Sequence, residues 1–223
     1  MAFFVRTSKP EDWQLFLAEP DRQWKDGYSA KTLAYCWMNA KGLPKSVENI
    51  LCENEAFIPI QFLAGFVEHK VYLPGGGHPS QNDILVLARL KKGLAVIAVE
   101  GKVSEPFGET IAEWLNTPSK GKTRRLDFLS GLLGIRFRDF QDVRYQFTHR
   151  AASALIEAKR FGASTAVMLI HSFSKDSKWF GDYSKFVALF GIKAFPNKAY
   201  LAKRIDEIDL YFAWVSETCM LLK

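Results

Sequence analysis

The chain has 223 residues, of which 48% are hydrophobic and 14% aromatic, so it can bury a sizeable core and disorder is not expected. Its formal net charge of +6 is compatible with a polyanionic partner such as nucleic acid. The three cysteines are widely spaced, which argues against a disulfide framework, and the polar residues after Arg6 argue against a signal peptide. The chain has no apolar run long enough for a membrane span, and we expect a cytoplasmic protein.

The first 69 residues are expected to be largely helical. Ser8 and Ser29 are suitable N-caps, and Gly42 is a suitable end for the second helix. The apolar run that ends at His69 is interpreted as a mostly buried helix. Together with a short strand at residues 3–6, the predicted helices span residues 8–20, 29–42, 44–53 and 58–69.

The rest of the chain alternates between strands and helices. A strand at residues 70–73 ends at PGGGHPSQ, a glycine-rich turn without the Gly-Lys-Ser/Thr of a phosphate-binding loop. Further strands are predicted at 83–90, 95–102, 164–173 and 208–217, and helices at 145–161, at 177–191 and on both sides of a basic loop at 116–122. This order indicates a mixed α/β fold.

The strands at 83–90 and 95–102 carry three charges at one end of an otherwise apolar hairpin. A two-residue turn at 92–93 would pair Asp83 with Lys102 and Leu85 with Glu100. Because directly opposed residues project from the same face of a sheet, the three charged side chains share one face. The opposite face is wholly apolar, so both faces are expected to be covered.

Charged groups beside such a dry sheet must pair or bind an ion, because their desolvation is costly. Asp83 and Glu100 could hold a divalent cation between them. In the alternative, Asp83 forms an ion pair with Lys102, and Glu100 caps a neighbouring backbone group. The four histidines show no metal-ligand spacing and are interpreted as structural.

These residues resemble the PD-(D/E)xK nuclease superfamily. Asn82-Asp83 stands where the family has Pro-Asp, and Glu100-Gly101-Lys102 matches E-x-K. The chain is also similar to a group of bacterial proteins of uncharacterised activity that carry the same SQND…VEGKV…EPFG pattern. The resemblance implies a restriction-endonuclease-like core of helix, three-strand meander, helix and strand. That core would cover about residues 50–175 of a single domain at 1–223, between an N-terminal helical extension at 1–49 and a C-terminal helix and strand at 176–223.

The resemblance also implies a metal site. Asp83, Glu100 and the Gly101 carbonyl are hard oxygen ligands of the kind that Mg²⁺ or Mn²⁺ prefers, and Lys102 would orient the attacking water or stabilise the phosphate. Glu68 is the candidate for the further carboxylate that many family members add, with a solvated helix-end residue as the alternative. The helix that follows the third strand often leans over the site, so Gln146 and Arg150 would contact the metal water or the phosphate. A satisfied polar helix face is the alternative for these two.

The implied activity is metal-dependent hydrolysis of phosphodiester bonds in nucleic acid, with DNA favoured over RNA. A basic cluster with interleaved aromatic residues fits a nucleic-acid surface, and its candidates are Lys120, Lys122, Arg124, Arg125 and Arg150. Two other hypotheses stay open. One is a catalytically inactive nuclease-like module that binds nucleic acid or protein, and the other is a purely structural or regulatory interaction protein.

Overall fold

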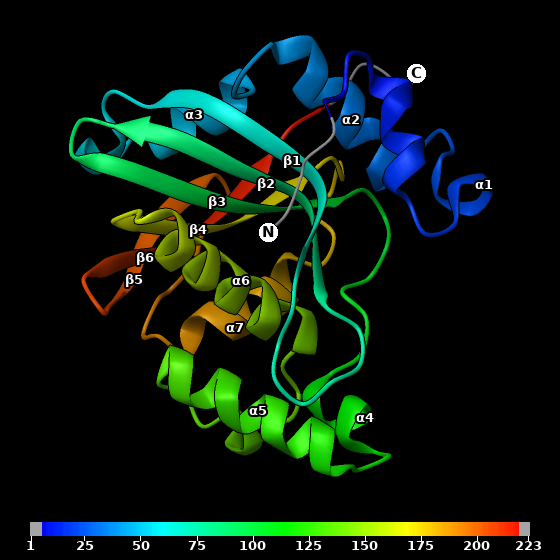
Figure 1. Ribbon diagram of the computed structural model, residues 1–223, viewed down its shortest axis with the longest axis vertical. Coiled ribbons are helices and arrows are strands. Elements are labelled where there is room, and N and C mark those ends of the chain that lie inside the picture. The colour runs from blue at the N-terminus through cyan, green and yellow to red at the C-terminus, as the bar shows by residue number, and fades with distance from the viewer. Residues whose placement is uncertain (1–5, 219–223) are drawn as a thin grey trace.

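The computed structural model describes residues 6–218, so the strand predicted at 3–6 falls largely outside the described residues. Its centre is one six-stranded sheet in the order β1-β2-β3-β4-β6-β5 (Figure 1). The strands are β1 (Gln61–Val71), β2 (Ser80–Leu90), β3 (Gly93–Lys102), β4 (Thr165–Ser172), β5 (Lys198–Ile205) and β6 (Ile208–Ser216). β1, β2 and β3 form an antiparallel meander, β3, β4 and β6 are parallel, and β5 closes the sheet antiparallel to β6.

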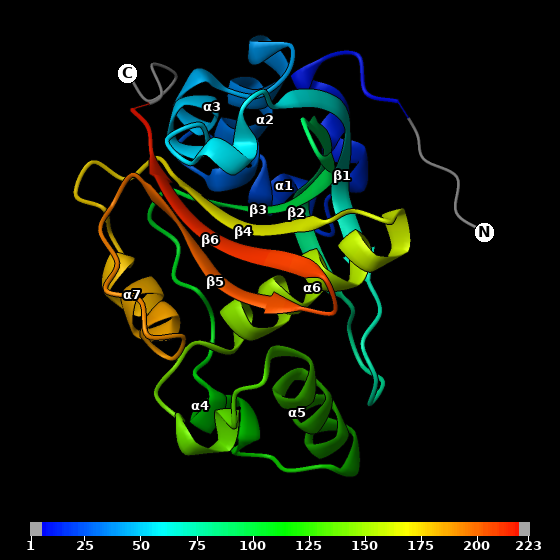
Figure 2. The same cartoon turned by 90° about the vertical axis from the view of Figure 1, so that its left-hand side faces the viewer.

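Helices cover both faces of the sheet (Figures 1 and 2). One face is covered by η1 (Pro10–Phe16), α1 (Pro20–Gln23), α2 (Ser29–Ala40) and α3 (Lys45–Leu51), with η2 (Glu55–Phe57) leading into β1. The other face is covered by α6 (Tyr145–Phe161) and α7 (Phe180–Ala188), and α4 (Ile111–Leu115), α5 (Lys120–Leu133) and η3 (Phe137–Asp139) lie beyond α6. Within the described part of the chain, no helix is long and apolar enough to span a bilayer.

The two faces form separate hydrophobic cores, which explains why the central strands are apolar throughout. Ile84, Val86 and Ile97 pack with α2 and α3. Leu85 and Ala98 pack with α5, α6 and α7. The prediction of a mixed α/β fold with strands covered on both sides is therefore confirmed.

The predicted helix at 58–69 is wrong, because this segment forms most of β1. A short apolar run gives no clear period when a strand has neighbours on both faces, and it then looks like a buried helix. The predicted strand at 70–73 is only the end of β1. The strand β5 was not predicted at all; it is an edge strand with three exposed charged residues among its eight, so its sequence lacks a clear hydrophobic pattern.

The β2–β3 hairpin differs from prediction by a shift of two residues. Leu90 pairs with Gly93, so the turn is Lys91-Lys92, and Ile84 pairs with Val99. Gly93 has a φ of 95°, and a Cβ there would approach the Ser164 hydroxyl oxygen at 3.1 Å, so glycine is needed beside the turn. Because side chains alternate with a period of two, this shift leaves every residue on its predicted face.

The predicted basic loop at 116–122 is wrong in its last three residues, which form the first turn of α5. Ser119 caps this helix by accepting a hydrogen bond from the Lys122 amide. The glycine-rich turn before β2 lies against the same helix end. A Cβ on Gly75 would collide with the Gly121 carbonyl oxygen, and a Cβ on Gly121 would collide with the Gly75 carbonyl oxygen. The glycines therefore let two backbones touch.

Replacing Gly121 with alanine is expected to lower the free energy of unfolding by about 2 kcal/mol, because the added methyl group must push the two backbones apart. Gly131→Ala in the same helix is the matched control, since a Cβ there meets nothing within 4 Å. This control is expected to raise stability by up to about 1 kcal/mol through helix propensity. Urea denaturation of both variants measures the difference, and equal effects would show that the glycine contact is unimportant.

Candidate functional site

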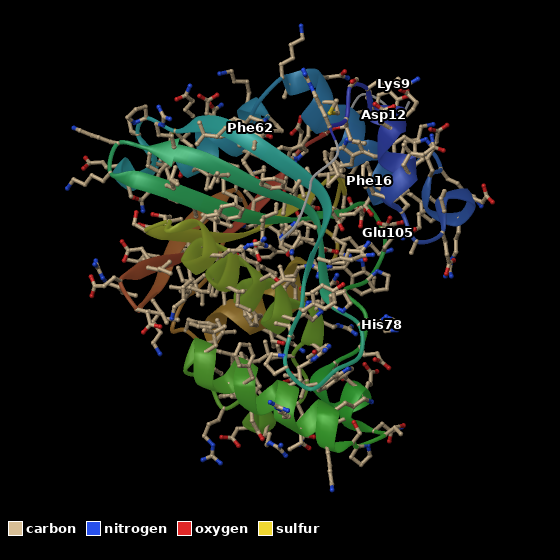
Figure 3. The ribbon with its side chains drawn as sticks, in the orientation of Figure 1. Lys9, Asp12, Phe16, Phe62, His78 and Glu105 are labelled. Carbon is tan, nitrogen blue, oxygen red and sulfur yellow. The ribbon has the colours of Figure 1, made fainter. Side chains whose placement is uncertain are left out.

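The ends of β1, β2 and β3 bring the predicted site residues together with two residues of α6. They line one cavity of about 520 Å³, and its lining includes Glu68, Asp83, Glu100, Lys102, Gln146 and Arg150. The N-terminal segment 17–30 forms the facing wall. Figure 3 shows Phe16 and Glu105 at this end of the sheet.

Glu100 is the centre of the polar network. Its side chain is nearly fully buried, and it accepts hydrogen bonds from Lys102 Nζ at 2.7 Å and Gln146 Nε2 at 2.8 Å on Oε1, and from Arg150 Nε at 2.7 Å on Oε2. Burial opposes ionisation, but the two positive charges and their hydrogen bonds outweigh it and lower the pKa of Glu100 to about 2. Glu100 is therefore a fixed anion near neutral pH.

Lys102 and Asp83 have different partners from those in the predicted ion-pair alternative. Lys102 binds Glu100 and lies over the Phe107 ring, with its Nζ 5.0 Å from the ring centroid. Asp83 Oδ2 instead accepts the Gly101 amide at 2.7 Å. The register shift explains the change of partner. Because Ile84 pairs with Val99, Asp83 lies opposite Glu100 on the neighbouring strand and not opposite Lys102.

Asp83 and Glu68 are both held in a poor environment for a negative charge. Burial raises the pKa of Asp83 well above its ordinary value, and the negative charges of Glu100 and Glu68 raise it further. Burial likewise raises the pKa of Glu68 to about 7, against the hydrogen bond from Gln81. Lys102 and Arg150 oppose the shift at Asp83 but do not cancel it. The ionised forms of Asp83 and Glu68 are thus disfavoured in this cavity, whereas that of Glu100 is favoured.

Glu68 lies on β1, which corrects the predicted helix end, and its backbone has a left-handed φ of 51°. This conformation is uncommon for a residue other than glycine and is found most often where a site holds the backbone in place. The side chain nevertheless lines the same cavity as Asp83 and Glu100. The structure therefore places Glu68 with the other candidates although its predicted element was wrong.

The donor set fits a divalent cation, with one restriction. Asp83 Oδ1 and Glu68 Oε1 accept no hydrogen bond from the residues that the structure describes, whereas three donors occupy Glu100. Within residues 6–218, the oxygen atoms of the three carboxylates do not all lie within 4.8 Å of one another. They are therefore too far apart to share one ion in this arrangement. Binding would therefore need the side chains to turn toward each other against their mutual repulsion, which the charge of a bound cation would overcome.

A second cluster of possible ligands is Cys36, His171 and Glu217, whose ligand atoms do lie within 4.8 Å of one another. The Trp37 indole N–H donates to His171 Nδ1 at 3.1 Å, so the proton of neutral His171 is on Nε2, which contacts Glu217 at 3.0 Å. Both ring nitrogens are thus in use. We interpret the cluster as a hydrogen-bond network that ties α2 to the end of β6, in agreement with the structural role predicted for the histidines.

The predicted nucleic-acid residues separate into exposed and enclosed groups. Lys120 and Arg124 are exposed on α5. Lys122 is half-buried and donates to the Trp114 carbonyl at 2.6 Å. Arg125 is buried and binds carbonyl groups of the glycine-rich turn, and Arg150 is buried against Glu100, so neither belongs to an exposed basic surface. These two arginines belong to the basic pattern in the sequence, but in the structure they form buried hydrogen bonds within the protein.

The wall formed by residues 17–30 was not predicted to reach the site. It is fastened there by Glu105, which accepts the Ser29 amide at 2.7 Å and the Val103 amide at 2.9 Å. The first of these contacts joins residues 76 positions apart. A local sequence pattern cannot predict a contact between such distant residues. The one available signal was that Glu105 belongs to the EPFG segment of the shared sequence pattern.

The chain belongs to the family described as a domain of unknown function (DUF6946), whose model matches residues 6–219. No curated protein and no solved structure matches the chain.

Proposed function

We propose that this protein is a metal-dependent phosphodiesterase that acts on nucleic acid, with DNA favoured over RNA, and that its core is of the restriction-endonuclease-like type. The observation that carries the proposal is the gathering of three carboxyl groups, those of Glu68, Asp83 and Glu100, in one cavity at the sheet end beside Lys102. A divalent cation would compensate the negative charges that these groups carry when ionised. The β1–β2–β3 meander, followed after α4 and α5 by α6 and the parallel strand β4, supports the fold assignment.

In this proposal Asp83, Glu100 and the Gly101 carbonyl hold Mg²⁺ or Mn²⁺, which when bound would activate a water molecule and neutralise charge on the phosphate. Lys102, already fixed by Glu100, stabilises the negative charge that develops on the phosphate oxygens. Gln146 and Arg150 keep Glu100 in position. Glu68 lines the same cavity and is the candidate to accept a proton from the attacking water.

The proposal is tested by nicking of supercoiled plasmid and by cleavage of single-stranded and duplex DNA and RNA oligonucleotides with Mg²⁺ or Mn²⁺. Wild-type protein is expected to cleave only with metal. Asp83→Ala and Lys102→Ala are each expected to lower the rate by about a hundredfold or more, since each removes a group that acts on the transition state. Equal rates in wild type and both variants would refute the proposal.

One observation favours a second candidate, a catalytically inactive module that binds nucleic acid or protein. The three donors around Glu100 satisfy it without any metal. For such a module we expect salt-dependent binding of nucleic acid, no cleavage and no heat on titration with Mn²⁺. A calorimetric Mn²⁺ titration of wild type against Asp83→Ala therefore separates the two candidates.

A further inference from the structure

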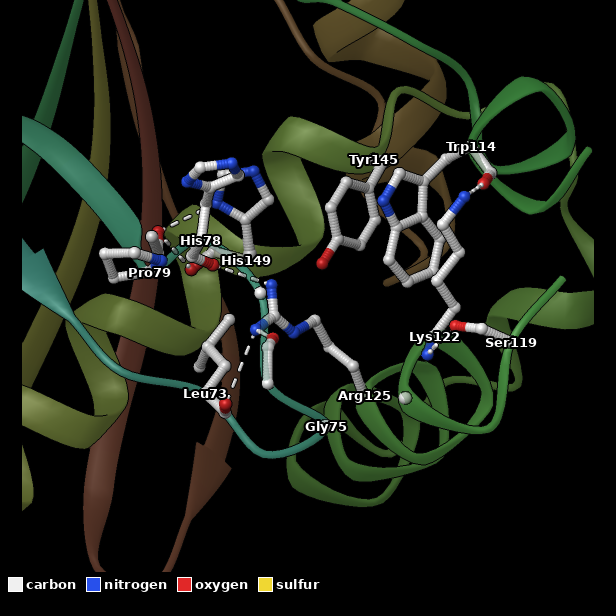
Figure 4. Close-up of a pocket in the computed structure, with 14 residues that line it drawn as sticks. Leu73, Gly75, His78, Pro79, Trp114, Ser119, Lys122, Arg125, Tyr145 and His149 are labelled. Atoms are coloured by element: carbon white, nitrogen blue, oxygen red, sulfur yellow. Dashed lines mark hydrogen bonds between the residues drawn. The ribbon is translucent and has the colours of Figure 1, made fainter. Parts of the chain in front are cut away.

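A second cavity, of about 400 Å³, lies beside the first and has opposite chemistry. Its walls are the glycine-rich turn before β2, the start of α5, Trp114 of α4 and the first turns of α6 (Figure 4). The Trp114 and Tyr145 rings are stacked with centroids 4.0 Å apart and form one flat side. The acids of the first cavity are absent here: none of the described residues that line it is an aspartate or a glutamate.

Two positive charges in this cavity have no acidic partner. Arg125, only 8% exposed, donates to the carbonyl groups of Pro74 at 3.2 Å and His78 at 2.8 Å and also to Gly76. Lys122 donates to the Trp114 carbonyl. Among residues 6–218, neither side chain forms a salt bridge. Carbonyl dipoles position these cations but leave their charge uncompensated.

The neighbouring polar groups present donors to the same space. Figure 4 shows the Tyr145 hydroxyl and the Arg125 guanidinium turned toward it. The Tyr145 hydroxyl is buried and interacts with the Arg125 guanidinium. His149 Nδ1 lies 3.3 Å from Arg150 Nη1, which can only donate, so the proton of neutral His149 is assigned to Nε2, where it is free to donate.

The first turn of α5 adds backbone donors. This helix has 14 residues, and its Ser119, Gly121 and Lys122 line the cavity. The free amides and the dipole at a helix N-terminus favour a bound anion. The cavity therefore combines two cations without an acidic partner, a buried hydroxyl and a helix N-terminus.

Ser80 connects this cavity with the first one. Its hydroxyl accepts from Arg150 Nη1 at 2.9 Å and lies 2.8 Å from His149 Nδ1. Arg150 in turn holds Glu100. A phosphate bound beside Ser80 is thus separated from the carboxylates by one layer of side chains.

We propose that this second cavity is a phosphate-binding site that takes the terminal phosphate of a nucleotide or of a nucleic-acid strand. Two cations and several neutral donors suit a phosphate dianion better than a carboxylate, which has fewer oxygens and less charge. The cavity is larger than a bare phosphate, so the attached nucleoside can lie against Trp114. The assignment of a strand end rests on the proposed nuclease function, whereas the assignment of a phosphate site does not.

The test is isothermal titration calorimetry with inorganic phosphate and with short single-stranded DNA carrying either a 5′-phosphate or a 5′-hydroxyl, all in EDTA so that nothing is cleaved. Wild type is expected to bind phosphate, and Lys122→Gln is expected to weaken binding about tenfold through loss of a charged donor. Tyr145→Phe, which keeps the ring stack, is expected to weaken it about fivefold. Lys159→Gln, the same charge change at the exposed C-terminal end of α6, should leave the affinity unchanged.

A preference for the 5′-phosphorylated strand that Lys122→Gln abolishes would identify a strand end as the source of the phosphate. Binding of free phosphate with equal affinity for the two strands would identify a free nucleotide or phosphate instead. Absence of phosphate binding by wild type, or equal affinity of folded Lys122→Gln and Lys159→Gln, would overturn the proposal. Because the measurement needs no metal, failure of the nuclease activity would leave its outcome unaffected.

Discussion

Asp83→Asn is expected to stabilise the protein by about 1 kcal/mol near pH 8 while removing metal-dependent cleavage. Burial, Glu100 and Glu68 all disfavour the ionised carboxyl group and raise its pKa, so a neutral amide removes this penalty. The asparagine oxygen can still accept the hydrogen bond that the Gly101 amide gives to Asp83 Oδ2. Stability and activity are thus expected to change in opposite directions.

The pH dependence of this effect follows from the sign of the shift. In the folded protein the pKa of Asp83 is raised, so the unfolded chain loses its proton first as the pH rises, and folding becomes less favourable. The gain from asparagine should therefore be absent near pH 3, where the carboxyl is neutral in both states, and should grow above about pH 4. Urea denaturation at several pH values measures it.

Asp127→Asn is a suitable control, because Asp127 is an exposed residue of α5 whose ion pair is with the exposed Arg138. Its effect is expected to stay within about 0.5 kcal/mol at all pH values. If Asp83→Asn instead lowered the stability, Asp83 would be a structural anion whose neighbours require its charge. That result would remove the main support for a cation at this site.

The shared face of Asp83, Glu100 and Lys102 was predictable because it depends on parity alone. An error of two residues in the turn left each side chain on its face, since the period of a strand is two. The exact partners were not predictable, because they depend on the register itself, and Lys102 consequently pairs with Glu100 and not with Asp83.

Other features depended on contacts between distant parts of the chain. The segment that forms β1 is a strand because it pairs with β2 and its apolar residues pack against the covering side chains. Its own sequence shows no two-residue hydrophobic period that would have predicted this. Arg125 looked like one of several basic surface residues. In α5 its side chain instead points inward and donates to a carbonyl group of the glycine-rich turn. A sequence pattern cannot tell an inward-pointing arginine from a surface arginine when the position of that turn is unknown.

Arg150→Met is expected to lower the free energy of unfolding by about 3 kcal/mol at neutral pH, because it leaves a buried carboxylate with one of its two cations missing. Glu100 and Arg150 are 3% and 6% exposed, and Arg150 Nε donates to Glu100 Oε2 at 2.7 Å. Thermal and urea unfolding measure the loss. Arg136→Met is the control, since its pair with Asp139 is exposed and should contribute less than about 0.5 kcal/mol.

The pair can be distinguished from simple packing by a second substitution and by pH. Glu100→Gln in the Arg150→Met background removes the stranded charge, so the double variant is expected to be more stable than Arg150→Met alone. The folded pKa of Glu100 is about 2, below its unfolded value, so the ion-pair contribution is present at neutral pH and is lost as the pH falls below about 4. A loss that persists unchanged in acid, and that Glu100→Gln does not reduce, would assign the role of Arg150 to its contacts with Ser80 and the helix and not to the charge of Glu100.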